Sequence, residues 1–386
     1  MSRVAETFLQ FLYLGCISFG GPSAHIGYFH TAFVQKLKWI DEDAYSRIVA
    51  LSQFLPGPGS SQVGFALGYR RAGLFGGIAA FIGFTLPSFL ILYFVAVYEP
   101  EKTSTTLFSD VIYGLKLLAV VVVADACYKM YKSFCTSRLA STIAILSSAI
   151  ILIVPSIWTQ IFVLLCGGAA GLFLQQEQAK NTTKNLKVLP NWRPLILFFL
   201  LLLMLPALAS TSLHVEIFSN FYHAGSFVFG GGHVVLPLLD QTIGNSLTND
   251  QFLTGYASAQ GVPGPMFSLA AYLGAALLPN HQLLGAVIAT LAIFMPGFLL
   301  ILGLQDTWET FASRPKISNV AIGINAAVVG LLIAALYNPV FVSAVSNRID
   351  CALIIIGLLC LNILRLPIAI LVAGFIAVGV TQYLII

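Results

Sequence analysis

Gln53-Phe54-Leu55-Pro56-Gly57-Pro58 is repeated as Gln260-Gly261-Val262-Pro263-Gly264-Pro265, and the second copy is displaced by 207 positions (263 − 56). Both copies interrupt apolar sequence. Proline has no amide hydrogen and disfavours helix at the residue before it, so two prolines around a glycine end a helix. In hydrocarbon, backbone freed in this way must be buried in protein or line a wet cavity. A matched pair of such breaks indicates a transport site.

The composition predicts an all-α polytopic membrane protein. The 386 residues are 58% hydrophobic and only 9% charged, whereas soluble domains carry about 25% charged residues. The Lys and Arg residues behind the net charge of +4 lie in short loops. We therefore interpret them as setting the orientation of the chain in the lipid membrane, and we expect no nucleic-acid partner. No nucleotide loop, metal-binding set or nucleophile–base pair is recognisable, so we expect no cofactor and no enzyme activity.

Further matches follow the first in the same order, at offsets between 206 and 210, and they predict a duplicated chain. They pair Phe19-Gly20-Gly21 with Phe229-Gly230-Gly231, Leu86-Pro87 with Met295-Pro296, and Gly114-Leu115-Lys116 with Gly323-Ile324-Asn325. We therefore predict an N-terminal repeat over 1–176, a loop and linking transmembrane helix over 177–215, and a C-terminal repeat over 216–386.

The apolar runs predict broken helices around each motif and plain helices elsewhere. Interrupted, re-entrant hairpins are expected at 8–38, 43–70, 217–246 and 251–278. Plain spans of about 20 residues are expected at 74–98, 107–128, 139–157, 160–176, 194–213, 282–305, 317–337, 350–364 and 367–386.

The basic loops predict the orientation. Alternation places Arg70 and Arg71, the loop 129–138 and the loop 180–193 on one face, which the positive-inside rule assigns to the cytoplasm together with the N-terminus. The extra span at 194–213 then starts the second copy on the opposite face. Arg348 falls outside and argues weakly against this arrangement. We predict two inverted repeats related by a pseudo-two-fold axis in the membrane plane.

Glycine clusters and glutamines are the first candidate binding groups. The clusters Gly20-Gly21-Pro22 and Gly230-Gly231-Gly232 would pack helices closely or expose amide groups to an anion. Gln53 and Gln260 each precede the first proline of a break by three residues, and would either donate to an oxyanion or satisfy freed carbonyls. Both interpretations of the glutamines stay open.

Ionisable groups in apolar surroundings are the second set of candidates. Lys116, with Asn325 as its counterpart, lies well inside a predicted span, and we favour a functional cation over a snorkelling one. Arg47 would bind a tetrahedral anion or lie at the interface. His25 and His233 would carry protons or simply form hydrogen bonds.

The chain carries Phe19-Gly20-Gly21-Pro22 with the following histidine, Trp39-Ile40 before an acidic turn, and the doubled Pro-Gly-Pro segments. In these features it resembles the chromate ion transporter family in its long, fused form. The resemblance covers nearly the whole chain. It implies a bacterial-type inner-membrane carrier that exports chromate, a tetrahedral dianion similar to sulfate, without a cofactor. One departure is Gly232, which stands where the first copy has Pro22, so the two halves need not contribute equally.

Our hypothesis is alternating access around a site near the membrane midplane that gives chromate resistance. Pro56-Gly57-Pro58, Pro263-Gly264-Pro265 and the glycine clusters would form its walls, with Lys116 as the positive charge. The first alternative is an anion channel or a carrier of another oxyanion. A membrane-embedded enzyme is favoured less, and a non-transporting scaffold is the third alternative. Driving ion, direction and assembly, including a homodimer, stay open.

Overall fold

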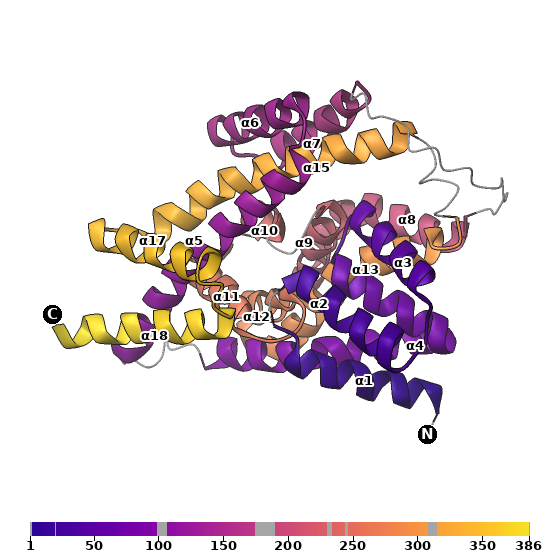
Figure 1. Ribbon diagram of the computed structural model, residues 1–386, viewed down its shortest axis with the longest axis horizontal. Helices are drawn as coiled ribbons and strands as arrows, with labels where there is room; N and C mark the ends of the chain where they lie inside the picture. The colour runs from indigo at the N-terminus through magenta and orange to yellow at the C-terminus, as the bar shows by residue number, and fades with distance from the viewer. Residues whose placement is uncertain are drawn as a thin grey trace.

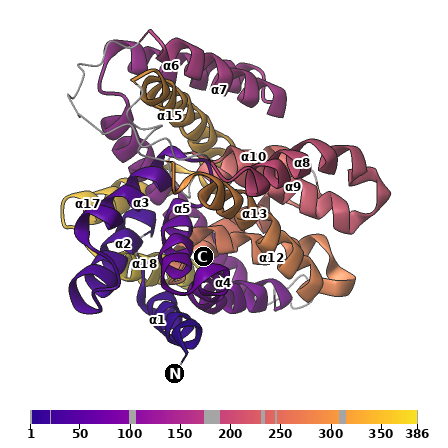
Figure 2. The ribbon, with the colours of Figure 1, turned by 90° about the vertical axis from the view of Figure 1, so that its right-hand side faces the viewer.

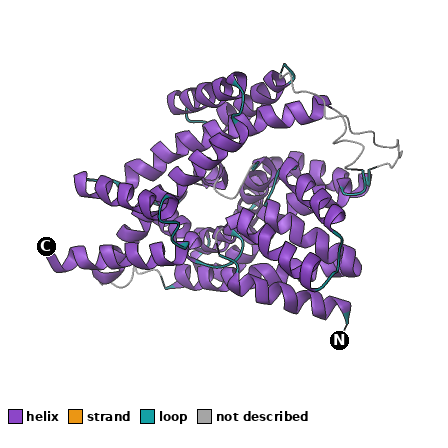
Figure 3. Cartoon of the chain, in the orientation of Figure 1, coloured by secondary structure: helices purple, strands orange, loops and turns teal. Residues whose placement is uncertain are grey.

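The structure is a computed structural model that describes residues 2–19, 21–98, 106–173, 190–229, 234–243, 246–307 and 315–385. Helices make up nearly all of these ranges, and no strand occurs within them (Figure 3). Five helical stretches there are long and apolar enough to cross a membrane, namely Gly59–Val97, Asp110–Phe134, Trp192–Thr211, Pro279–Leu304 and Asn319–Ala344. The chain is therefore a multi-pass, helical membrane protein.

The first part of copy one contains the first helix break. Its elements are α1 (Arg3–Ile17), α2 (Gly21–Phe29), a π-helix (His30–Lys36), α3 (Glu42–Phe54) and α4 (Gly59–Val97). Because α3 ends at Phe54 and α4 begins at Gly59, the expected interruption at 55–58 is present. Within α4, Ala72 and Gly73 have non-helical backbone angles, so α4 consists of two segments joined at a sharp bend.

The rest of copy one is α5 (Thr106–Phe134), α6 (Arg138–Ile153) and α7 (Ile157–Gly171). Helix α5 continues past residue 128, where we expected it to end. Helices α6 and α7, with 16 and 15 residues, are shorter than the expected spans of about 20 residues. The causes are local: α6 stops before Pro155, and Ser156 then accepts a backbone amide and caps a new helix that begins at Ile157. Helix α8 (Trp192–Leu208) then links the copies, followed by a 3₁₀ turn (Ala209–Thr211).

Copy two has a similar order of elements. It comprises α9 (Leu213–Phe227), α10 (Val235–Ile243), α11 (Asn249–Gly261), a 3₁₀ turn (Met266–Ser268), α12 (Leu269–Leu277), a 3₁₀ turn (Pro279–His281), α13 (Gln282–Leu304), α15 (Pro315–Ala335), a π-helix (Leu336–Phe341), α16 (Val342–Ala344), α17 (Arg348–Asn362) and α18 (Ile368–Ile385). Helix α11 ends before Pro263, so the second motif also interrupts a helix.

In the most extensive contacts between the two copies, helices of each copy pack against helices of the other. Helix α15 of copy two packs on α6 and α7 of copy one, while α5 of copy one packs on α17 and α18 of copy two (Figure 1). Backbones meet closely at Gly114 against Phe375 and, at the equivalent positions, at Gly323 against Gly167. Helices α12 and α13 also pack against α4 (Figure 2). Each copy thus completes the packing of the other.

Candidate functional site

The helix break in each copy forms a backbone hydrogen bond to the other copy. Gly57 donates its amide hydrogen to the carbonyl of Val228 at 2.7 Å, and Gly264 donates to the carbonyl of Ser18 at 2.9 Å. Ser18 and Val228 are the C-cap residues of α1 and α9, which occupy equivalent positions in the repeat. One amide of each break is therefore paired inside the protein, which hydrocarbon surroundings favour.

A buried glutamine side chain donates a hydrogen bond to the backbone at the first break. The side-chain amide of Gln62 donates to the carbonyl of Pro56 at 2.9 Å and to that of Gly297 at 3.2 Å, and Gln62 is fully buried. Residue 297 belongs to α13 of copy two, so this side chain also joins the copies. At the second break the backbone of Gly264 lies against Ser88, whose hydroxyl is 2.7 Å from that of Ser268.

A polar cavity of about 290 Å³ lies beside the first break. Its lining residues come from the start of α2, the end of α3, the start of α4 and the end of α5, namely Pro22, Ile26, Ser52, Gln53, Gly57, Gly59, Ser60, Lys129, Met130, Ser133 and Phe134. Drug-sized ligands occupy pockets of about 300–1,000 Å³, so this cavity suits a small ligand.

The chemistry of this cavity favours an anion. Lys129 supplies a full positive charge, and Gln53 and Ser133 supply side-chain donors. Helices α2 and α4 begin here, and the first amides of a helix carry partial positive charge. The α4 N-cap, Pro58, makes no side-chain capping hydrogen bond.

Lys129 already has a carboxylate neighbour. Its ammonium group lies 2.7 Å from the carboxylate of Asp125, one helical turn earlier on α5. The lysine side chain is 63% exposed, whereas Asp125 is buried and its second oxygen has no hydrogen-bond partner. An anion entering the cavity would therefore compete with Asp125 for the lysine.

Some of the predicted site residues meet at this cavity and others do not. Pro22, Gln53 and Gly57 line it, and Gly21, with φ of 78°, begins α2 beside it. Pro56 instead lines a separate apolar cavity of about 280 Å³, together with Phe54, Leu55, Leu172, Phe229, Val320, Ala321 and Ile324.

His25 lies next to the polar cavity, and Arg47 lies on an exposed face. The Nδ1 atom of His25 is 3.1 Å from the hydroxyl of Ser60, a lining residue, and the ring is buried against Phe84. Its Nε2 atom has no hydrogen-bond partner. Arg47 is an exposed residue of α3 and does not line the polar cavity.

Lys116 is paired with a carboxylate of the other copy. Its ammonium group binds the carboxylate of Asp250, at the start of α11, and the lysine side chain is 13% exposed against 77% for the aspartate. The charge is therefore neutralised in this conformation and does not face the polar cavity. The counterpart Asn325 is buried, and its Oδ1 atom has no hydrogen-bond partner.

Three lining positions of the polar cavity carry non-polar side chains or lose their glycine in copy two. Where copy one has Ser52, Gly59 and Ser60, the 207-residue offset gives Ala259, Met266 and Phe267, all buried. Gln260 directs its amide to the sulfur of Met266 at 3.6 Å. The second break itself is formed by Pro263, Gly264 and Pro265. Predicted residues outside the described ranges are Gly20, Gly230, Gly231, Gly232 and His233.

Lys129, Ser133 and Gln62 are the residues that sequence reasoning missed. The apolar pattern predicts a span that ends at residue 128 and so places Lys129 and Ser133 in a loop, whereas α5 reaches Phe134. Gln62 follows the motif by four residues, but Leu269 occupies the equivalent position, so comparing the two copies hides it.

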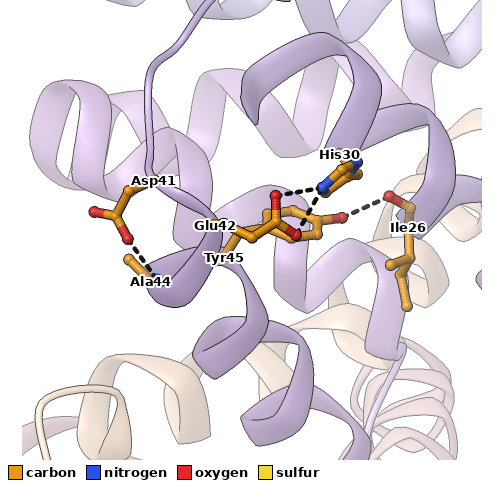
Figure 4. A network of polar contacts seen from close by, with 6 residues as sticks. All are labelled: Ile26, His30, Asp41, Glu42, Ala44 and Tyr45. Atoms are coloured by element: carbon orange, nitrogen blue, oxygen red, sulfur yellow. Dashed lines mark hydrogen bonds and ion pairs between the residues drawn. The ribbon is translucent and has the colours of Figure 1, made fainter. Parts of the chain in front are cut away.

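A surface network fixes α3 at the end opposite the break (Figure 4). His30 binds both carboxylate oxygens of Glu42 at 2.9 and 2.8 Å, and the hydroxyl of Tyr45 donates to the carbonyl of Ile26 at 2.5 Å. Asp41 caps the helix by accepting the amide of Ala44 at 2.7 Å, which holds the pKa of Asp41 below its usual value. This network holds α3 against α2, and both helices line the cavity.

Comparisons with known proteins agree with this duplicated architecture. The sequence profile of the family described as "Chromate transporter" matches residues 5–172 and again residues 215–380. A "Probable chromate transport protein" of Synechococcus elongatus is 30% identical, over 84% of this chain and 81% of its own. A "Chromate transport protein" of Cupriavidus metallidurans is 28% identical, over 97% and 92%. No solved structure matches. With both halves matched by the same profile, the chain belongs to the chromate transporter family.

Proposed function

We propose that this protein is a secondary transporter that exports chromate from the cytoplasm by alternating access and so gives chromate resistance. The observation that carries the proposal is the polar cavity at the first helix break, where Lys129, Gln53, Ser133 and two helix N-termini converge. Transport folds bind anionic groups at such half-helix N-termini. The relatives named for chromate transport supply the substrate.

The exchanged contacts support inverted halves. A pair such as Gly57 with Val228 recurs as Gly264 with Ser18, with the copies exchanged, as an approximate two-fold axis requires. The linking helix α8 is apolar and long enough to cross the membrane, so it would deliver copy two to the opposite face. We place the axis in the membrane plane, and rocking of one half against the other would open the cavity to each side in turn.

Export of a dianion is favoured by the membrane potential. A negative interior of 100 mV contributes about 2.3 kcal/mol for each charge that leaves. The amide and hydroxyl donors of the cavity would collect the anion, and competition between the anion and Asp125 for Lys129 would keep binding weak enough for release.

Everted membrane vesicles from cells that express the protein test this function. We expect uptake of chromate that saturates, is inhibited by excess sulfate or molybdate, and shows counterflow when vesicles are preloaded with chromate. Vesicles from cells without the protein are the control. Flux that rises linearly with concentration and shows no counterflow would indicate a channel, and flux equal to the control would refute the proposal.

A further inference from the structure

A second, smaller polar cavity lies between the two copies, away from the first break. It has a volume of about 60 Å³ and is lined by Ile151, Leu152, Pro155, Gln160, Pro237, Asp240, Leu331, Ala334, Ala335 and Asn338. These residues come from the end of α6 and the turn after it, the first turn of α7, α10, the end of α15 and the π-helix that follows it. A single water needs about 10–15 Å³, so the cavity has room for an ion with water.

Gln160, which lines this cavity, has a buried side-chain oxygen without a hydrogen-bond partner. The residue is 1% exposed, and its amide nitrogen donates to the carbonyl of Pro237 at 3.4 Å. The opposite orientation of the amide would set two oxygens against each other, so this hydrogen bond fixes which atom is which. The Oε1 atom is buried and has no hydrogen-bond partner. Leaving such an acceptor without a donor or a cation costs about 1–3 kcal/mol.

The other two polar side chains at the cavity also carry oxygen acceptors. Asp240 contributes a carboxylate and Asn338 an amide oxygen. Helix α6 ends at Ile153, and the last carbonyls of a helix carry partial negative charge, whereas α15 continues into the π-helix Leu336–Phe341. The N-terminus of α7 opposes this field, but its Ser156 cap already accepts the amide of Trp158.

We propose that this cavity is a binding site for a monovalent alkali cation, Na⁺, held by the Asp240 carboxylate and the Gln160 Oε1 atom, with Asn338 at its mouth. Hard cations prefer carboxylate, amide and carbonyl oxygens. Among the described residues no three His, Cys, Asp or Glu side chains gather as a transition-metal site would need. Unwound backbone and helix C-termini bind Na⁺ in other transport folds.

The position of the site gives it a role in coupling, and this role rests on the proposed transport function. Asn338 is the copy-two equivalent of Lys129, at the 209-residue offset that also relates Lys116 to Asn325. Lys129 lines the anion cavity, and Asn338 lines the cation cavity. Asn338 lies in the π-helix that follows α15, so equivalent positions of the two copies would face ligands of opposite charge. We infer that inward movement of the cation would drive outward movement of the anion.

Binding of ²²Na⁺ to the purified full-length protein in detergent tests the site without any transport assay. We expect saturable binding that unlabelled NaCl displaces and choline chloride at the same ionic strength does not. Asp240→Asn and Gln160→Met should each weaken the affinity at least tenfold, whereas Asp43→Asn, which removes an exposed carboxylate elsewhere, should leave it unchanged. Circular dichroism checks that each variant is folded.

Wild-type protein without displaceable ²²Na⁺ binding would overturn the proposal, whatever the variants do, and so would unchanged binding in a folded Asp240→Asn protein. The two proposals fail separately. Protein that binds Na⁺ but moves no chromate contradicts only the transport function, and protein that moves chromate but binds no Na⁺ contradicts only the cation site.

Discussion

The amide of Gly57 donates a hydrogen bond of 2.7 Å to the carbonyl of Val228, so the helix break of copy one is completed by copy two. The equivalent bond from Gly264 to Ser18 completes the other break. A shift of one half against the other must therefore stretch or exchange these bonds. Because the polar cavity begins at the same break, we infer that movement between the halves and exposure of the cavity are linked.

Gly57→Ala should destabilise the protein and abolish transport. The φ angle of Gly57 is 122°, and an added Cβ would lie 2.9 Å from the Cα of Gly297. A non-glycine residue in such a conformation costs on the order of 1–3 kcal/mol, and the contact with α13 adds to this. Thermal unfolding in detergent measures the loss. Gly374→Ala is the control, because nothing lies within 4 Å of its added Cβ, and equal melting temperatures for the two variants would contradict the prediction.

Gln62→Leu should destabilise the protein by removing a hydrogen-bond donor at the first break. The change removes the donor to the carbonyl of Pro56 at the break, and a buried unsatisfied acceptor costs about 1–3 kcal/mol. We expect a lower melting temperature, measured in detergent, although Leu269 is tolerated at the equivalent position. Gln35→Leu alters the same atoms on an exposed residue and should have little effect. An unchanged melting temperature for Gln62→Leu would show that the amide is dispensable.

Lys129→Gln should lower chromate transport at least tenfold, which corresponds to about 1.4 kcal/mol. The variant removes the positive charge that lines the polar cavity but keeps a hydrogen-bond donor of similar reach. Initial rates in everted vesicles, normalised to the amount of protein, measure the effect. Lys132→Gln, on the same helix but exposed and outside the cavity lining, is the matched control. If both variants transport at the wild-type rate, the anion does not use this cavity.

Exchanging the charges of Lys116 and Asp250 in a double variant should restore the transport rate that either single charge reversal lowers. The pair joins α5 of copy one to α11 of copy two, so Lys116→Asp and Asp250→Lys should each slow transport several-fold, and the double variant should recover most of the rate. Asp43→Lys changes the equivalent exposed position of copy one and serves as the control. A double variant as slow as the worse single variant would mean that Lys116 acts on the substrate directly.

The local features of the fold could be predicted from sequence, and the contacts between copies could not. Proline and glycine act on their own backbone, so the breaks at Pro56 and Pro263 follow from the residues alone. The partner of Lys116 is 134 positions away in the sequence, and no local pattern indicates it. The cavity lysine was missed because a polar helix end and a loop have similar composition, and only the helical continuation of α5 to Phe134 turns Lys129 toward the break.

The inverted arrangement of the two halves is the claim on which the transport cycle depends, and the sidedness of two equivalent residues tests it most directly. Arg138 and Arg348, 210 positions apart, are exposed first residues of α6 and α17. In a protein whose six native cysteines are replaced, we expect a membrane-impermeant maleimide to label Arg138→Cys only from the cytoplasmic side and Arg348→Cys only from the outside. Labelling of both from the same side would contradict the account.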